Sequence, residues 1–294
     1  MPTQLNPQRL LAREFPNIEH RYDQRDTALY ALGLGLGSDP TDSQQLAYVY
    51  EGVDGSTMRG FPTLANVLAY PGFWAREADT GIDWRRLVHA EQFVQWHAPI
   101  PANGCVHART RITGLWDRGE GKGAFLEQTR DIYDSADSRL LATVRQLNLL
   151  RGDGGFGPGG SDGAPAAAHV MPEREPDTVC DLSTLPQSAL IYRLSGDMNP
   201  LHADPEVARA AGFERPILHG MATMGIAAHA VLRSILDYDA LRLKAMRVRF
   251  TAVVYPGDTL RTEIWRDGSV LSLRMTALER GVVVLNQCRV DIAS

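Results

Sequence analysis

The sequence predicts an α+β fold in which a long central helix is wrapped by an antiparallel β-sheet, with this unit present twice. The C-terminal half shows a long apolar segment followed by four segments with the apolar alternation of β-strands. The N-terminal half repeats the same order of elements. Between them, residues 151–169 are dominated by Gly, Pro and Ala, a composition that favours a flexible linker. We therefore expect two domains, residues 1–150 and 170–294.

In the C-terminal half, the main helix is expected at residues 220–236, which carry Met, Ala, Ile, Val and Leu with few charges and should be buried. A short helix is expected at 188–194. Another should begin at Asp204-Pro205, because Asp is a preferred N-cap and Pro suits the first helical position. The four strands are expected at 246–251, 260–266, 271–278 and 282–292. Short Asp-Gly or Arg-Gly turns join the last three, which predicts an antiparallel sheet.

The N-terminal half resembles the C-terminal half at two places in the same order. DTALYALGLG around Tyr30 is similar to QSALIYRLSGD around Tyr192, and HAPIPANGCV is similar to FTAVVYPGDTL. An internal duplication explains both similarities. The duplicated unit should begin a helix within residues 63–70. Its strands are expected at 89–97, 106–117, 124–133 and 140–150.

The composition is that of a folded globular protein, with 44% hydrophobic and 22% charged residues. The net charge is -5 and Lys and Arg are scattered, which argues against a nucleic-acid partner. The three cysteines are far apart and form no Cys-x-x-Cys pair, so we expect neither disulfides nor a zinc site, in a reducing compartment. No apolar run has the length of a signal peptide or a bilayer span. We expect a cytoplasmic protein without a membrane partner.

The segment from Ser195 to Gly220 is the most informative for function. Gly196 and Asn199-Pro200 predict a tight loop, and within it Asp197 and His202 stand five residues apart. A carboxylate beside an imidazole can hold a water, remove its proton and return a proton elsewhere. Gly220 opens the predicted buried helix, where free backbone N–H groups stabilise developing negative charge. Such a site suits chemistry next to a thioester carbonyl.

The strings SGDMNPLHADP and AGFERPILHGMAT resemble the MaoC-like, R-specific (type 2) enoyl-CoA hydratases, which also occur as a domain of peroxisomal multifunctional enzymes. Supporting similarities, among them ALYALGLG, YVYEG, WDRGEGKG and GGFG, extend over nearly the whole chain. The family has the hotdog fold, and its long members are double hotdogs. The resemblance therefore implies two tandem hotdogs, a homodimer, and an enzyme acting on acyl-CoA thioesters. Its implied reaction is the reversible hydration of trans-2-enoyl-CoA to (3R)-3-hydroxyacyl-CoA, with no cofactor and no metal.

By this resemblance, Asp197 and His202 form the catalytic pair, Asn199 supports them, and the Gly220 amide binds the thioester oxygen. Ala90 and Arg118 stand where relatives have a glycine and a lysine. The positions that match CoA-ester contacts in the family are His89, Ala90, Arg118, Asn199, Pro200, Leu201, His202, Gly220 and Phe250.

Other interpretations of these residues stay open. An isolated Asp and His at this spacing would more often serve a turn and a loop, but the full string with its downstream His-Gly favours catalysis. His219 is expected to orient the loop. Phe250 alternates with Val248 and also suits the core, and Arg118 also suits a solvated strand end. Two alternative functions are an acyl-CoA thioesterase on the same fold and a non-catalytic acyl-CoA-binding protein.

The two halves differ at the catalytic position. Aligning Tyr30 with Tyr192 places Gly35 opposite Asp197, so one active site per chain is expected, on the C-terminal half. The non-catalytic half is then free to accommodate the acyl chain. We expect medium and long chains to be accepted, with a pocket wall formed by Leu64, Val67 and Leu68.

Overall fold

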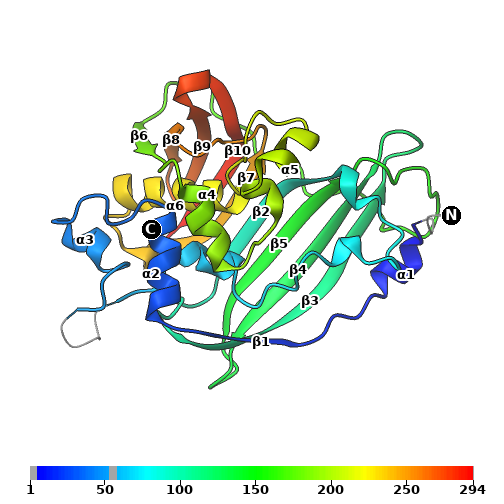
Figure 1. Ribbon diagram of the computed structural model, residues 1–294, viewed down its shortest axis with the longest axis horizontal. Coiled ribbons are helices and arrows are strands. Elements are labelled where there is room, and N and C mark those ends of the chain that lie inside the picture. Colours follow the sequence, from blue (N-terminus) through cyan, green and yellow to red (C-terminus); the bar gives the residue numbers. More distant parts are fainter. Residues whose placement is uncertain (1–4, 53–57, 294) are drawn as a thin grey trace.

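The computed structural model describes residues 5–52 and 58–293. Within these ranges, ten strands form one antiparallel sheet in the order β1-β3-β4-β5-β2-β7-β10-β9-β8-β6 (Figure 1). The strands are β1 (Ile18–Tyr22), β2 (Leu87–Trp96), β3 (Gly104–Asp117), β4 (Ala124–Asp134), β5 (Leu140–Leu150), β6 (Thr178–Ser183), β7 (Leu243–Phe250), β8 (Thr259–Asp267), β9 (Val270–Ala277) and β10 (Val282–Ile292). The five strands of each half therefore stay together in the sheet.

The helices are short with two exceptions. The α-helices are α1 (Pro7–Leu11), α2 (Gln24–Gly33), α3 (Ser43–Leu46), α4 (Ser188–Tyr192), α5 (Pro205–Ala210) and α6 (Gly220–Ser234). The 3₁₀ helices are η1 (Pro62–Asn66), η2 (Trp74–Arg76), η3 (Trp84–Arg86), η4 (Arg193–Ser195), η5 (Pro200–His202), η6 (Ala240–Arg242) and η7 (Leu278–Arg280). The longest, α6, packs against η1, β2, β6 and β8.

The eight strands predicted from alternation are all present, and β5 and β10 begin and end at the predicted residues. The predicted helices at 188–194, after Asp204 and at 220–236 are also confirmed. Two edge strands, β1 and β6, were not predicted. They span five and six residues, and their alternation is too short to stand out from loop sequence.

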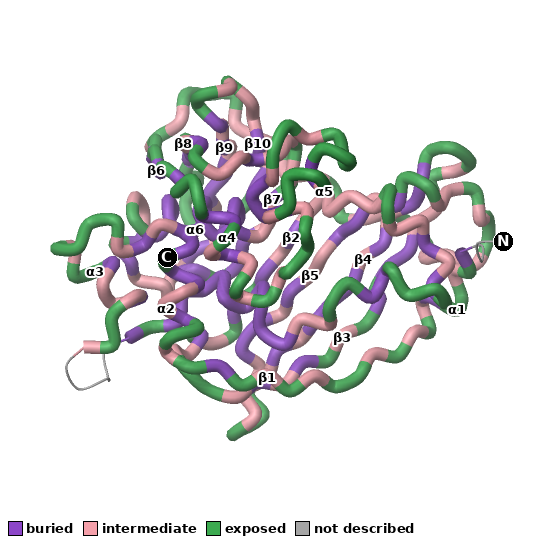
Figure 2. Tube along the Cα trace, viewed as in Figure 1, coloured by how far each residue is buried: buried purple, intermediate pink, exposed green. Residues whose placement is uncertain are grey.

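Helix α6 is buried because its sequence is apolar on every side. Every residue from Ala222 to Leu232 is buried (Figure 2). A Cβ atom on Gly225 would lie 2.6 Å from the Cδ2 atom of Leu34, so glycine lets the end of α2 approach the helix closely. Helix α6 thus contacts the first half of the chain as well as its own.

The prediction of a long helix in each half is wrong for the first half. Within the described residues, the corresponding segment is the short 3₁₀ helix η1. Ala69 adopts a left-handed φ of 48°, and Pro71 disfavours helical backbone at Tyr70. These two features stop the helix that was expected to begin within residues 63–70, so among residues 5–52 and 58–293 α6 alone supplies a long central helix.

The two halves meet in one continuous sheet and one core. Strands β2 and β7 pair antiparallel, with Glu91 opposite Arg249. The rings of Tyr30 and Tyr192, which the sequence aligns, lie 5.5 Å apart and are fully buried. Their contact agrees with a duplicated chain whose two copies face each other.

Residues 151–169 contain no helix or strand, but they bond to both halves. The Asp117 carboxylate accepts hydrogen bonds from the Gly155 and Gly157 amides, each at 2.8 Å. Arg247 donates to the carbonyls of Ala166 and Ala167 at 2.8 Å and forms an ion pair with Glu91. The segment is therefore held against the β2–β7 junction.

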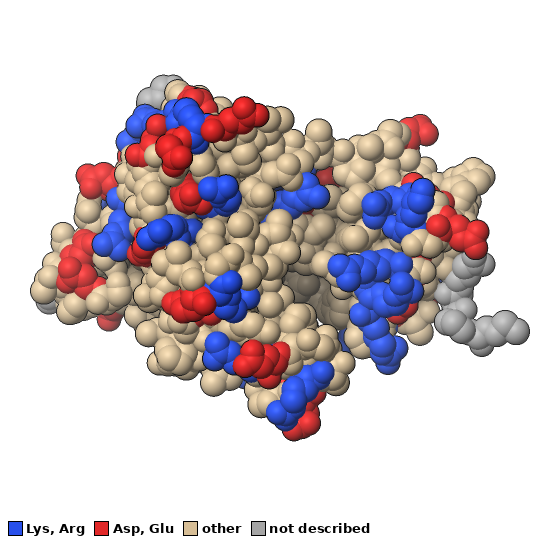
Figure 3. All heavy atoms as spheres, turned by 90° about the horizontal axis from the view of Figure 1, so that it is seen from above, with Lys and Arg blue, Asp and Glu red and all other residues tan. Residues whose placement is uncertain are grey.

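Figure 3 shows the face seen from above the view of Figure 1. It has a hollow near its middle, and a group of Lys and Arg side chains lies on one side of that hollow. Among the described residues, no helix combines the length and apolar character that crossing a membrane requires.

Candidate active site

The loop between α4 and α5 holds the predicted catalytic residues. Gly196 has a φ of 119°, a left-handed conformation that favours glycine, and it ends η4. The Asn199 amide donates to Asp197 Oδ1 at 3.2 Å, and the Leu201 amide donates to Asn199 Oδ1 at 3.1 Å. These local bonds turn the chain into η5, which carries His202 at its end. Asn199 therefore shapes the loop that carries the pair.

His202 is buried and held in one tautomer. Its Nδ1–H donates to the carbonyl of Ile217 at 2.8 Å, which leaves Nε2 with a free lone pair. Burial lowers the pKa of His202 below its usual value, so the ring is neutral near pH 7. A neutral imidazole with a free Nε2 is able to accept a proton.

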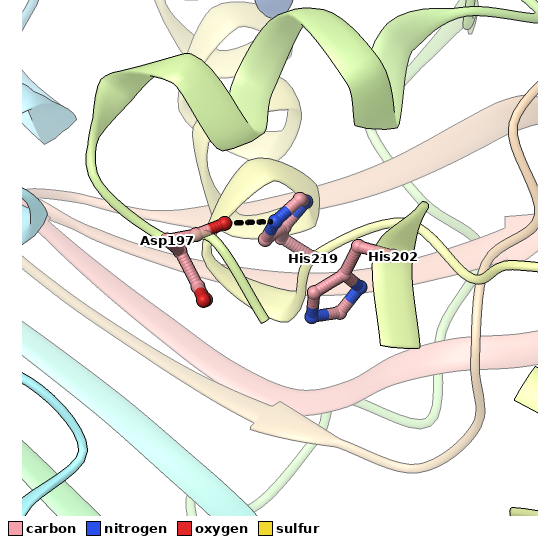
Figure 4. Close-up of side chains that lie close together, drawn as sticks. All are labelled: Asp197, His202 and His219. Atoms are coloured by element: carbon pink, nitrogen blue, oxygen red, sulfur yellow. Dashed lines mark hydrogen bonds between the residues drawn. The ribbon is translucent and has the colours of Figure 1, made fainter. Parts of the chain in front are cut away.

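His219 supports both members of the pair. Its Nε2–H donates to the backbone carbonyl of Asp197 at 3.2 Å, and its ring stacks on that of His202 with centroids 3.6 Å apart (Figure 4). Burial, together with the nearby His202, lowers the pKa of His219 to about 3. His219 thus orients the loop, the role that the sequence indicated.

The ligand atoms of Asp197, His202 and His219 all lie within 4.8 Å of one another. The two histidine rings are stacked, with an interplanar angle of 25°, so their free nitrogens lie side by side. A tetrahedral metal site instead needs lone pairs that converge on one centre. The geometry therefore favours a proton-transfer unit over a metal centre.

Gly220 lies at the first position of α6, beside this unit. The preceding residue, His219, is the N-cap and makes no side-chain cap hydrogen bond. The first N–H groups of a helix have no partner within it, so the Gly220 amide is free to bind an oxygen. A Cβ atom on Gly220 would lie 3.1 Å from the Phe250 ring, which explains the need for a small residue.

Two predicted contact residues, His89 and Ala90, lie on β2, and His89 packs against Phe250. The His89 ring is 4.8 Å from the Phe250 ring, and its Nε2–H is shared between the Glu91 carbonyl at 3.1 Å and Gln92 Oε1 at 3.0 Å. Burial lowers the pKa of His89 to about 4, so it is neutral. The β2–β5 register shifts between His89 and Glu91, which makes Ala90 the extra residue of a bulge.

The remaining predicted contacts lie apart from this cluster or at its edge. Pro200 is exposed and Leu201 half-buried in η5. Arg118 is exposed on the β3–β4 turn, where it donates to the Lys122 carbonyl at 2.9 Å and lies over the Phe125 ring. No described contact joins Arg118 to Asp197 or His202. Leu64, Val67 and Leu68 are buried in the main core.

Sequence reasoning missed a group of buried polar side chains beside the site. Gln92, Gln128 and Arg130 are at most 5% exposed. Gln128 and Arg130 share the parity of Leu126 and Ile132 along β4, so period two places all four on the same, inward face. That alternation was the signal available in the sequence.

Models of two domain families match the two halves of the chain. One, described as the MFE-2 hydratase 2 N-terminal domain, matches residues 20–152, and the other, described as the MaoC like domain, matches residues 167–287. The chain is 38% identical to the enoyl-CoA hydratase ChsH3 of Mycobacterium tuberculosis, with 94% of each chain covered. It is 36% identical to the peroxisomal enoyl-CoA hydratase 2 of Arabidopsis thaliana, covering 96% of this chain and 94% of the relative.

The chain belongs to the MaoC-like dehydratase and hydratase 2 family. A crystal structure of a MaoC-like dehydratase from Phytophthora capsici is similar over 97% of this chain and 98% of its own, with a TM-score of 0.85 and 29% identity. A Mycobacterium tuberculosis protein described as a double hotdog matches with a TM-score of 0.58 and 18% identity, covering 95% and 96% of the two chains. The expected double hotdog fold of this family member is confirmed.

Proposed function

We propose that this protein catalyses the reversible hydration of trans-2-enoyl-CoA to (3R)-3-hydroxyacyl-CoA. The proposal rests on the proximity of Asp197 to the free Nε2 of His202. Beside them lie the N–H groups of the first turn of α6, which have no partner within the helix. A water held by Asp197 and His202 and a thioester oxygen held by the Gly220 amide would place the reacting atoms together. The naming of similar proteins as enoyl-CoA hydratases supports the same reaction.

In the proposed reaction, water lies between Asp197 and His202. The pair takes one proton of the water as its oxygen bonds to C3, and a proton from the pair is delivered to C2. The electrons of the double bond move toward the thioester carbonyl, and the Gly220 N–H stabilises the charge on its oxygen. Each water atom ends in the product, so no external reductant or oxidant is needed.

The substrate contacts are part of the proposal. His89, Ala90, Pro200, Leu201 and Phe250 would flank the CoA ester at the mouth of this site. Arg118 and the Lys and Arg group beside the hollow in Figure 3 would attract the negatively charged phosphates of CoA.

We also propose that medium and long acyl chains are accepted. Leu64, Val67 and Leu68 of the non-catalytic half share one apolar cluster with residues of α6, which supports an apolar path along that helix. Each buried methylene would contribute up to about 0.8 kcal/mol to binding.

The test is an absorbance assay of enoyl-thioester loss on a short enoyl-CoA, with a thiol reagent in parallel. Hydration predicts loss of the double bond without free CoA. Free CoA release would indicate a thioesterase, and neither signal would indicate a binding protein. Coupling to an S-specific dehydrogenase decides the stereochemistry: efficient reduction of NAD would contradict the R assignment.

A further inference from the structure

A small polar cavity lies beside the first turn of α6. Its volume is about 10 Å³, close to the space of one water. Gln92 of β2, Gln146 of β5 and Gln128 of β4 form a row across three adjacent strands, because Gln146 is paired with each of the other two. All three line the cavity, and the only apolar side chains that line it are Val144 and Met221. The surface is therefore polar, and a group larger than one water enters it when the half-buried side chains of Met221 and Gln146 move aside.

Arg130 is the charged group of this cavity, and it is only 2% exposed. Its Nη2 donates to the carbonyls of Ala65 and Asn66 at 3.1 and 2.7 Å. Its Nε is buried without a hydrogen-bond partner. Part of the guanidinium is thus fixed by the backbone, while other N–H groups remain available.

Within the described residues, no carboxylate forms an ion pair with Arg130. The nearest aromatic is Tyr70, whose ring centroid is 5.4 Å from the guanidinium carbon and which also lines the cavity. Burial lowers the pKa of Arg130 to about 10, so the group is charged at neutral pH. A buried charge without a counter-ion is costly, so an anion that reaches Arg130 would be stabilised there.

The cavity is joined to the active site by contacts. Met221, which lines it, directly follows Gly220 in α6. On the other side, His89 Nε2–H donates to Gln92 Oε1, and Gln92 Nε2 donates to Asn66 Oδ1 at 2.9 Å. Asn66 in turn offers its backbone carbonyl to Arg130. An acyl chain that leaves the thioester along α6 would pass Met221 and reach this polar surface.

We propose that Arg130 and the glutamine row bind a carboxylate carried on the acyl chain, so that the preferred substrates are carboxylated 2-enoyl-CoA thioesters. This inference rests on the proposed hydratase function. The flat guanidinium presents donors that match a carboxylate, and the glutamine amides can bond the same oxygens. A methyl terminus at this place would gain no hydrogen bond, and the Arg130 Nε–H would stay without a partner.

The experiment compares matched substrates in the whole protein. We measure kcat/KM for the CoA esters of trans-2-enoic acids of six, eight and ten carbons, each with a terminal carboxylate or a terminal methyl. For at least one length, the carboxylated substrate should be preferred by about tenfold or more. In Arg130→Gln and Arg130→Met that preference should be lost. Because it is a ratio within one variant, it is insensitive to a loss of folded protein.

The control is Arg109→Gln, which removes an exposed arginine from the neighbouring strand β3 and should keep the preference. Equal or weaker turnover of the carboxylated substrates at all lengths would overturn the proposal, as would a preference that survives Arg130→Met. If neither series is hydrated, the proposed function fails. The affinities of the saturated octanedioyl-CoA and octanoyl-CoA then decide the carboxylate site alone, with equal affinities refuting it.

Discussion

Replacing Asp197 by Asn and His202 by Gln tests whether the two residues act as one unit. Their ligand atoms lie within 4.8 Å of each other, close enough to share one water. Each substitution keeps the approximate size of the side chain and removes its ability to take a proton. If both are needed for the same transfer, losing either should remove nearly the whole contribution of the pair.

The expected size of the effect follows from acid–base catalysis, which contributes about 10²- to 10⁴-fold to rate. Each single variant should therefore lose about 3–5 kcal/mol of transition-state stabilisation, since tenfold corresponds to about 1.4 kcal/mol. Independent residues would give about twice that loss in the double variant. Members of one unit should give a double variant little worse than either single one.

The assay is kcat/KM for enoyl-CoA hydration, followed by absorbance, with thermal unfolding as the measure of folded protein. His97→Gln and Asp137→Asn are matched controls, because both residues are exposed and neither contacts the loop at Asp197. A folded Asp197→Asn variant with near-normal turnover would refute the assignment. A double variant whose loss equals the sum of the two single losses would refute the idea of a unit.

Three further outcomes are expected. Burial lowers the pKa of His219 to about 3 and that of His229 to about 4, below the usual histidine pKa of about 6.5. The unfolded chain therefore binds more protons, and urea unfolding should show stability falling by about 1.4 kcal/mol per pH unit for each of them as pH drops from about 6 to 4. A His229→Gln variant should show a shallower slope, and an unchanged slope would contradict this reasoning. Across even-numbered unsubstituted enoyl-CoA chains, kcat/KM should not fall sharply beyond six carbons, and such a fall would mean that the acyl path is closed. Arg247→Met should destabilise the protein by about 3 kcal/mol, because it leaves the Glu91 carboxylate buried without its partner; the exposed Arg249→Met is the control, and equal unfolding midpoints for both would count against the argument.

The sequence determined most of the secondary structure and the catalytic loop. Long strands such as β5 and β10 keep their alternation over eleven residues, so their ends were predictable. The apolar composition of α6 predicted its burial, and the string around Asp197 and His202 predicted their proximity, because five residues in a tight loop leave little freedom. The homodimer and the cytoplasmic location stay predictions from sequence.

Tertiary structure decided what depends on residues far apart in the chain. The pairing of β2 with β7 joins the strands of the two halves into one sheet, and the left-handed backbone at Ala69 stops the helix expected within residues 63–70. His202 becomes a defined base only because Ile217, fifteen residues away, fixes its tautomer. Arg130 shares its cavity with residues of β2, β5 and α6. Whether a charged side chain is buried depends on such surroundings, and sequence spacing does not encode them.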